Sequence, residues 1–157
     1  MDAYRTYAPA LLRKAERILQ NSDDAQDVVH TLFVELLQQR DPRTDLPYLY
    51  RAVTNRCINM LRDRASRARL LRQHDGLLRG PVRTTCEQRS IDLELLGQLA
   101  QSLDREAAEI VVYRYLDDMS QEEIAELLGL SRKTIGQRLA KIRDAVQQLA
   151  AENGGTP

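Results

Sequence analysis

The segment from Ser120 to Arg143 constrains the fold more than any other part of the sequence, because its spacing fits two helices joined by a tight turn. Ser120 is a good N-cap, and Glu123 at the third helical position completes a capping box. Gly129 tolerates the left-handed backbone angles of a helix end, and Ser131 can cap the second helix. We therefore predict a helix-turn-helix, a motif whose second helix enters the major groove of DNA.

Each predicted helix of this motif carries apolar residues on one side. They recur at steps of three and four, as Ile124, Leu127 and Leu128 and then as Ile135, Leu139, Ile142, Val146 and Leu149. The opposite face of the second helix holds Arg132, Lys133, Thr134, Gln137, Arg138 and Lys141. Arginine and glutamine suit base edges and lysine suits phosphate. The alternative is an amphipathic hairpin whose basic face is merely solvated.

Composition favours an all-helical chain, with 43% hydrophobic and 4% aromatic residues among 157. No run of eighteen apolar residues and no basic-then-apolar leader is present, so we expect a soluble cytoplasmic protein without membrane insertion. Cys57 and Cys86 cannot build a disulfide framework, and His30 and His74 lack ligand spacing. We expect no metal, no cofactor and no catalytic residue.

The net charge of zero conceals a segregation of charge along the chain. Residues 51–72 contain seven arginines and one acid, residues 92–130 contain ten acids and two arginines, and residues 131–143 contain five basic residues and no acid. Two basic segments divided by an acidic one predict two separate contacts with a polyanion.

Periodicity predicts helices at 4–20, 24–39, 47–72, 91–103 and 104–116 before the helix-turn-helix. Ser22 or Asp23 is expected to cap the second helix. The buried face of the second helix would use Val28, Val29, Leu32, Phe33, Leu36 and Leu37. The buried face of the third helix would use Leu49, Tyr50, Val53, Cys57, Met60 and Leu61. The periodicity disappears over 73–89, where glycines and a proline indicate a linker, and 151–157 should be a disordered tail. We predict an all-α fold with two small helical domains, 1–72 and 90–150, joined by a flexible linker.

Three blocks in this order resemble the extracytoplasmic-function sigma factors of the bacterial sigma-70 family. The blocks are DAQDVVHTLFVELL (24–37), YLYRAVTNRCINMLRDRAS (48–66) and the stretch from Leu103 to Arg143. The resemblance implies a sigma factor, not an enzyme, that directs core RNA polymerase to promoters and promotes DNA opening. It also implies a region 2-like helical bundle over 1–72, a region 4-like helix-turn-helix domain over 90–150, and regulation by an anti-sigma factor.

The resemblance also implies residue roles. Polymerase binding would fall to Asp24, Asp27, His30, Thr31 and Glu35. Binding of the −10 promoter element would fall to Arg51, Asn55, Arg56, Asn59, Arg62, Arg64 and Arg67. Binding of the −35 element would fall to Arg132, Lys133, Thr134, Gln137, Arg138 and Lys141. Tyr50 and Tyr113 match common family aromatics, for which core packing is favoured over base stacking.

The chain departs from the family pattern at several positions. It has no tryptophan, Tyr48 takes the place of the family tryptophan, and His30 replaces the usual glutamine. The polar loop over 39–46 lacks an aromatic residue that could line a flipped-base pocket. Gly136 lies inside the second helix of the motif, where we expect it to permit close approach to DNA or to the preceding helix. Two other functions stay open: a stand-alone helix-turn-helix regulator, and a sigma-like adaptor without promoter melting.

Overall fold

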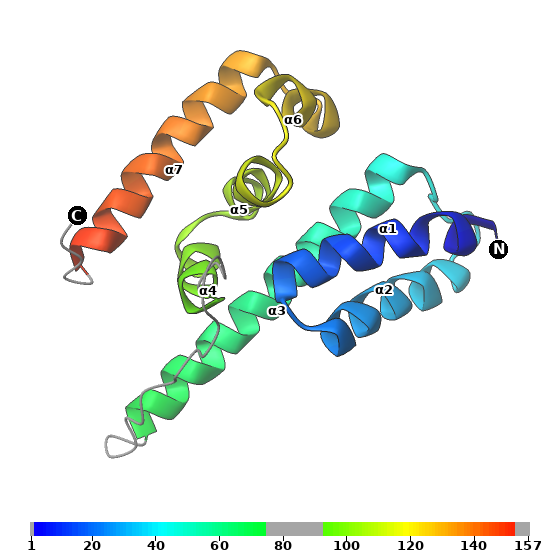
Figure 1. Ribbon diagram of the computed structural model, residues 1–157, viewed down its shortest axis with the longest axis horizontal. Coiled ribbons are helices and arrows are strands. Elements are labelled where there is room, and N and C mark those ends of the chain that lie inside the picture. Colours follow the sequence, from blue (N-terminus) through cyan, green and yellow to red (C-terminus); the bar gives the residue numbers. More distant parts are fainter. Residues whose placement is uncertain (1, 75–92, 153–157) are drawn as a thin grey trace.

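A computed structural model describes residues 2–74 and 93–152, and all regular structure in these ranges is helical (Figure 1). Most of the predicted linker, Cys86, the predicted start of the helix at 91 and the predicted tail from 153 onward lie outside the described residues. No helix within the described ranges is long and apolar enough to span a bilayer.

The N-terminal half consists of α1 (Asp2–Leu19), α2 (Ser22–Leu37) and α3 (Leu46–His74). The first two helices pack beside one end of α3, whose other end projects past them (Figure 1). Gln20, with φ 52°, ends α1. The predicted cap of α2 was wrong, because Asn21 Oδ1 accepts the Asp24 N–H at 3.0 Å. An Asn in extended backbone can offer this acceptor as well as Ser or Asp can.

The core of this half follows the predicted apolar positions with one clear exception. Leu11, Ile18, Val29, Leu32, Leu49 and Val53 are among the buried residues, and Cys57 is fully buried as expected. Leu37, predicted to be buried, is 62% exposed because it is the last residue of α2 and the core of this half ends one residue earlier, at Leu36. Asp45 begins α3 by accepting the Tyr48 N–H at 3.1 Å.

The C-terminal half contains α4 (Leu93–Ser102), α5 (Arg105–Val111), the π-helical turn η1 (Val112–Leu116), α6 (Gln121–Leu128) and α7 (Arg132–Glu152). The helix predicted over 104–116 is therefore divided, with Asp104 as its cap and its last five residues wound more widely. Between α6 and α7 the predicted motif is confirmed: Ser120 and Glu123 form the capping box, and Gly129 ends α6 at φ 68°.

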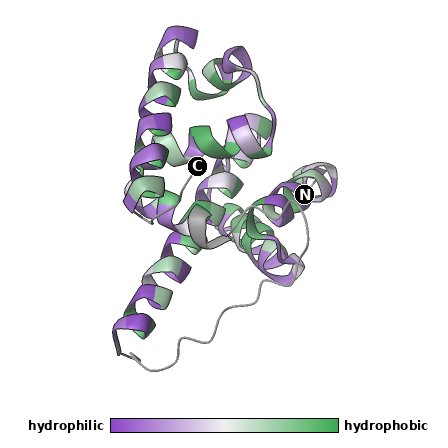
Figure 2. Cartoon of the chain, turned by 60° about the vertical axis from the view of Figure 1, so that its left-hand side comes forward, coloured by the Kyte–Doolittle hydropathy of each residue, from purple (hydrophilic) through white to green (hydrophobic). Residues whose placement is uncertain are grey.

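The two halves share a core. One cluster of buried residues joins α1, α2 and α3 to Leu96, Ala100, Ala108 and Val112 of the C-terminal half. A second cluster, which includes Ile110, Tyr113, Ile124, Ile135 and Leu139, holds α5, η1, α6 and α7 together. Hydrophobic stretches turn inward along these helices, whereas the projecting end of α3 is largely hydrophilic (Figure 2). The two predicted helical domains are thus in direct contact with each other in this structure.

Candidate nucleic-acid interface

The first turns of α7 present the basic and polar set predicted for the −35 element. Arg132, Lys133, Gln137 and Lys141 are exposed, whereas Thr134 and Arg138 are half-buried. Ser131 caps α7, because its hydroxyl accepts the Thr134 N–H at 3.1 Å and lies 2.8 Å from the Thr134 hydroxyl. Thr134 therefore has a local structural role that its place on the basic face did not indicate.

Two arginines of this face already have carboxylate partners. Arg132 pairs with Glu122 of α6 at 3.0 Å, and Arg138 pairs with Glu106 of α5. Both pairs are solvent-accessible, so they are worth little and can exchange for phosphate. A methyl group at Gly136 would lie 3.5 Å from Gln121 Oε1, an ordinary contact, so packing against α6 does not require glycine there.

A cleft of about 460 Å³ between α2 and α3 brings together residues of the predicted polymerase and −10 sets. The first set contributes Asp27 and Thr31, and the second contributes Arg56, Asn59, Arg64 and Arg67. Ion pairs join the same sets, Arg56 to Glu35 and Arg64 to Asp24. The Arg56 guanidinium holds the pKa of the Glu35 carboxyl below its usual range. Residues assigned to two different partners thus adjoin one another across these helices.

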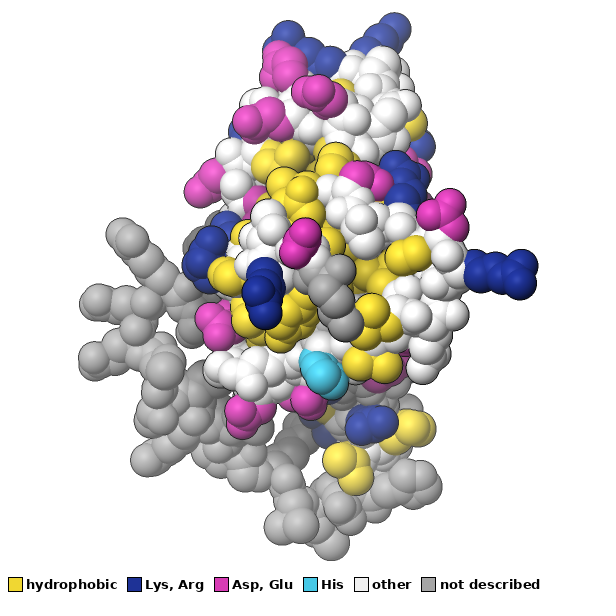
Figure 3. All heavy atoms as spheres, turned by 90° about the vertical axis from the view of Figure 1, so that its right-hand side faces the viewer, with side chains coloured by type: hydrophobic (Ala, Val, Ile, Leu, Met, Phe, Trp, Pro, Cys, Tyr) yellow, Lys and Arg dark blue, Asp and Glu magenta, His cyan; other side chains and the backbone are white. Residues whose placement is uncertain are grey.

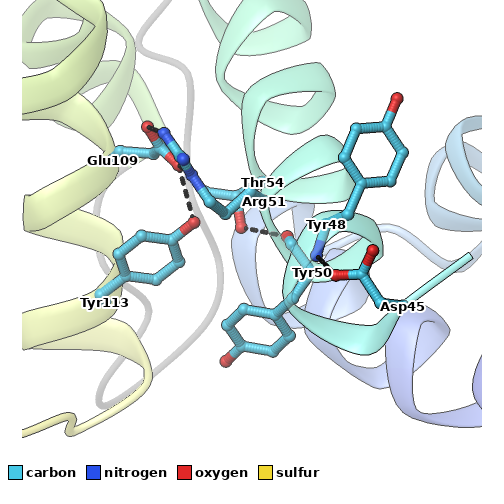
Figure 4. A network of polar contacts seen from close by, with 7 residues as sticks. All are labelled: Asp45, Tyr48, Tyr50, Arg51, Thr54, Glu109 and Tyr113. Atoms are coloured by element: carbon cyan, nitrogen blue, oxygen red, sulfur yellow. Dashed lines mark hydrogen bonds and ion pairs between the residues drawn. The ribbon is translucent and has the colours of Figure 1, made fainter. Parts of the chain in front are cut away.

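Arg51 and Arg62, also predicted for the −10 set, instead face the C-terminal half. Arg51 Nε donates to Glu109 Oε1 of α5 at 2.9 Å, and this hydrogen bond raises the pKa of Arg51. The Tyr113 hydroxyl donates to the same carboxylate oxygen at 2.8 Å (Figure 4). Arg62 donates to the Ala100 carbonyl and, at 2.9 Å, to the Leu103 carbonyl at the end of α4. Glu109 is nearly inaccessible, so Arg51 provides the charge that its burial requires.

A buried ion pair that the sequence pattern did not predict lies beside this network. Lys14 of α1 donates to Asp117 at 2.5 Å, with side-chain exposures of 1% and 2%. Its ammonium lies 3.8 Å from the Tyr50 ring centroid, and Tyr50 stacks on Tyr113 with centroids 5.8 Å apart. Burial lowers the pKa of Lys14, whereas Asp117 opposes that shift. The signal in the sequence was a lysine in register with Leu11 and Ile18 on the apolar stripe of α1.

The two tyrosines of this cluster belong to the packed interior. Tyr113 is fully buried and Tyr50 is half-buried, so core packing, the favoured interpretation, is confirmed. Asn55, in contrast, keeps a buried Oδ1 without a hydrogen-bond partner among the described residues. An unpaired buried acceptor is uncommon and is a point at which a ligand donor would be favourable.

An apolar groove lies at the other end of α2. Its lining includes Tyr4, His30, Val34 and Leu37, and it has a volume of about 330 Å³. Tyr4, Val34 and Leu37 are exposed by 44%, 39% and 62%. Hydrophobic side chains gather in the middle of the face at this end of the molecule (Figure 3). The groove adjoins His30 of the predicted polymerase set and thus adds an apolar component to that surface.

Two family profiles match the two halves of the chain. Sigma-70 region 2 matches residues 3–67, and Sigma-70, region 4 matches residues 93–146. The RNA polymerase sigma-E factor of Streptomyces coelicolor is 31% identical over 150 residues, covering 89% of this chain and 81% of that protein. The sigma-E factor of Streptomyces avermitilis is 32% identical over 153 residues, covering 91% and 82%.

A solved structure shares the helical fold. It is the sigma factor RpoE from Bartonella quintana in complex with the anti-sigma factor NepR, with a TM-score of 0.50, 20% identity and 94% coverage of each chain. The two profile matches and the Streptomyces relatives show the family of this chain, and the shared helical fold agrees with them. The chain belongs to the sigma-70 family, as an extracytoplasmic-function sigma factor that acts with RNA polymerase in transcription initiation.

Proposed function

We propose that this sigma factor binds a promoter through α7 and α3 and binds core polymerase through the outer face of α2. The observation that carries the proposal is the presence of two basic surfaces on separate helices of one chain. One is the first turns of α7, and the other is the arginine-bearing length of α3. A helix with a basic first turn fits the major groove, whereas a row of arginines on a second helix fits phosphates farther along the same promoter.

At the −35 element, α7 would lie in the groove with its N-terminal residues toward the bases. Arg132, Gln137 and Arg138 have the donors and acceptors for base edges, and Lys133 and Lys141 suit phosphates. Replacing a base-reading side chain should cost about 1–3 kcal/mol at its own position, whereas replacing a phosphate-binding side chain should weaken all promoters alike. Thr134, engaged with Ser131, would position the start of the helix.

At the −10 element, α3 would hold one strand by its phosphates while Asn55 meets an unstacked base. A carboxamide can donate to and accept from a base edge at once, and the unpaired Asn55 Oδ1 supports this role. Favourable contacts to unpaired bases offset a few kcal/mol of unstacking for each step, so opening would need no ATP. The protein would thus act by binding and not by catalysis.

Polymerase docking would use the exposed face of α2. Asp27, His30, Thr31 and Glu35 are exposed there, Asp24 is half-buried, and the apolar groove beside His30 supplies the hydrophobic part that a protein interface needs. Because its partners are polymerase and promoter DNA, we place its action in the cytoplasm. An anti-sigma factor is a further proposed partner, supported by the complex of the Bartonella quintana protein.

Run-off transcription with bacterial core polymerase on genomic fragments tests this function. The purified chain should produce discrete transcripts that core polymerase alone does not. A stand-alone regulator would bind DNA but would not enable core polymerase to start transcription at promoters. A sigma-like adaptor would bind polymerase without yielding transcripts. Mapping transcript starts after overexpression would then identify the promoter sequence.

A further inference from the structure

Asp63 differs from its neighbours on α3 because it is the one acid in the arginine-rich stretch over 51–72. It is exposed and lines the cleft between α2 and α3, together with Asn59 and Arg67. A carboxylate in a surface that binds phosphates repels them and so lowers the affinity for every promoter. A contact that offsets this repulsion has to be with a part of the DNA other than phosphate.

The Asp63 carboxylate has no hydrogen bond or ion pair within the described residues. Arg67, one turn farther along α3, has none there either, although oppositely charged residues four positions apart on a helix commonly pair. Arg64, the residue after Asp63, pairs instead with Asp24 of α2. The cleft thus offers an acidic acceptor and a basic donor whose hydrogen-bonding capacity is unused.

The positions of these residues on α3 form a regular series. Asn59, Asp63 and Arg67 recur every four residues, so they follow one another along one side of the helix, and each step advances about 6 Å. Asn55, proposed above to meet an unstacked base, begins the series one turn earlier. A strand that meets Asn55 and runs along this side of α3 brings a further base to Asp63, while Arg67 can neutralise a phosphate.

The hydrogen-bonding capacity of a carboxylate determines which base it favours. An ionised Asp accepts through two oxygens and donates nothing. Unpaired guanine presents two adjacent donors on its Watson–Crick edge, N1–H and the 2-amino group. Adenine and cytosine each place an acceptor nitrogen beside the amino group, and thymine has a carbonyl on either side of its one donor. Only guanine therefore engages both carboxylate oxygens without placing an acceptor against one of them.

We propose that Asp63 makes the −10 recognition of this chain specific for a guanine in the unpaired strand. The proposal rests on the proposed role of α3 in binding that strand. Any other base leaves the carboxylate near phosphates without a matching pair of donors, so the same side chain both favours guanine and disfavours the alternatives. Asp63 thus lowers general affinity for DNA and increases selectivity at one position.

Transcription by the holoenzyme from a library of templates tests the proposal. The templates carry a genomic promoter found by the run-off assay, with its −10 region randomised, and a barcode in the transcript identifies each template. The wild-type chain should favour guanine at one position of the non-template strand by at least about fivefold. Asp63→Ala should remove this preference and leave the preferences at the other positions unchanged.

Asp63→Asn should produce a change of specificity that a merely structural role would not produce. A carboxamide keeps the size of the side chain but replaces one acceptor with a donor. Adenine and cytosine, with an amino group beside an acceptor nitrogen, match this arrangement, so the preferred base should change from guanine to one of these two. The matched control, Glu16→Gln, removes the same charge from an exposed position on α1 and should keep the guanine preference.

A change in the DNA isolates the contact itself. The guanine identified in the library is replaced by hypoxanthine, which lacks the 2-amino group, in a template whose −10 region is non-complementary, so that base pairing does not contribute. This replacement should weaken binding by the wild-type holoenzyme at least about fivefold and should have no effect with Asp63→Ala. The control base, 7-deazaguanine, keeps the Watson–Crick edge and should bind as guanine does.

The outcomes separate failure of this proposal from failure of the proposed function. If the wild type transcribes the library without favouring guanine at any position, or if Asp63→Ala keeps that preference, the proposal is wrong although the function stands. An equal increase in transcription from all templates with Asp63→Ala would show that the carboxylate only repels phosphate, which would also overturn the proposal. If the wild type transcribes neither the library nor any genomic fragment, the proposed function fails and this proposal fails with it.

Discussion

Replacing Asp117 by asparagine should remove the counter-charge of Lys14 while leaving the shape of the side chain almost unchanged. Both partners are almost inaccessible, so solvent does not screen the change. Breaking a buried pair by removing one partner costs about 3–5 kcal/mol. Arg17, which lies 3.2 Å from Asp117 and is half-exposed, gains freedom and offsets a little of this cost. We expect a decrease of about 3 kcal/mol in the free energy of unfolding, or roughly 6–12 °C in Tm for a chain of this size.

Urea unfolding of four proteins provides the test: the wild type, Asp117→Asn, Lys14→Met, and the double variant. Because each single variant leaves one buried charge without its partner and the double variant leaves none, the double variant should be more stable than either single variant. The coupling energy of the cycle should be about 2 kcal/mol or more, well above the error for independent sites. Additive effects of the two substitutions would refute the claim that Lys14 and Asp117 stabilise the contact between the two halves as a pair.

The pH dependence supplies an independent check with a defined sign. Burial lowers the pKa of Lys14 below 10.5, so the folded chain holds this proton less tightly than the unfolded chain does. Stability should therefore rise with pH toward 10.5 and level off above it. Without Asp117 the pKa should fall further, because the charge that opposes the shift is gone. The difference in free energy of unfolding between the wild type and Asp117→Asn should thus become smaller as the pH increases from about 7 to 10.

Three further predictions concern other parts of the chain. In the holoenzyme, Arg62→Ala with Arg64→Ala should weaken promoter opening and reduce the salt slope by about 0.9 for each phosphate that is no longer neutralised; an unchanged slope would exclude contact of this part of α3 with DNA. Gly136→Ala should raise Tm by the equivalent of about 1 kcal/mol. If the Gly136→Ala variant binds promoter DNA normally, close approach of α7 to DNA does not require glycine at position 136. Burial raises the pKa of Cys57 to about 12, so in a Cys86→Ser background this thiol should resist alkylation at about pH 8 until urea unfolds the chain, and rapid native labelling would contradict the burial.

The sequence predicted most of the local structure because local rules govern it. Capping at Ser120, the left-handed end at Gly129 and the apolar register of α7 each depend on residues a few positions apart. The same rules erred at the two ends of α2. Asn21 took the capping role expected of its neighbours, and Leu37 lay past the end of the core.

The arrangement of the halves lay beyond these rules because its contacts join distant residues. Lys14 and Asp117 are 103 positions apart, and Arg51 and Glu109 are 58 apart. Charge segregation indicated that the arginines of α3 would contact a polyanion. It could not reveal that Arg51 and Arg62 would instead donate hydrogen bonds to acceptors in the C-terminal half of the same chain. A lysine within the apolar stripe of α1 was the available signal, and it became interpretable only with Asp117 in place.

Affinity for bacterial core RNA polymerase tests the central claim most directly. The full chain, immobilised and titrated with core enzyme, should bind saturably, and Asp27→Arg on the exposed face of α2 should weaken binding at least about tenfold because it reverses a charge within the interface. Ala10→Leu on the exposed side of α1 is the control and should bind as the wild type does. Absence of saturable binding by the folded wild-type chain would contradict its proposed role as an initiation factor.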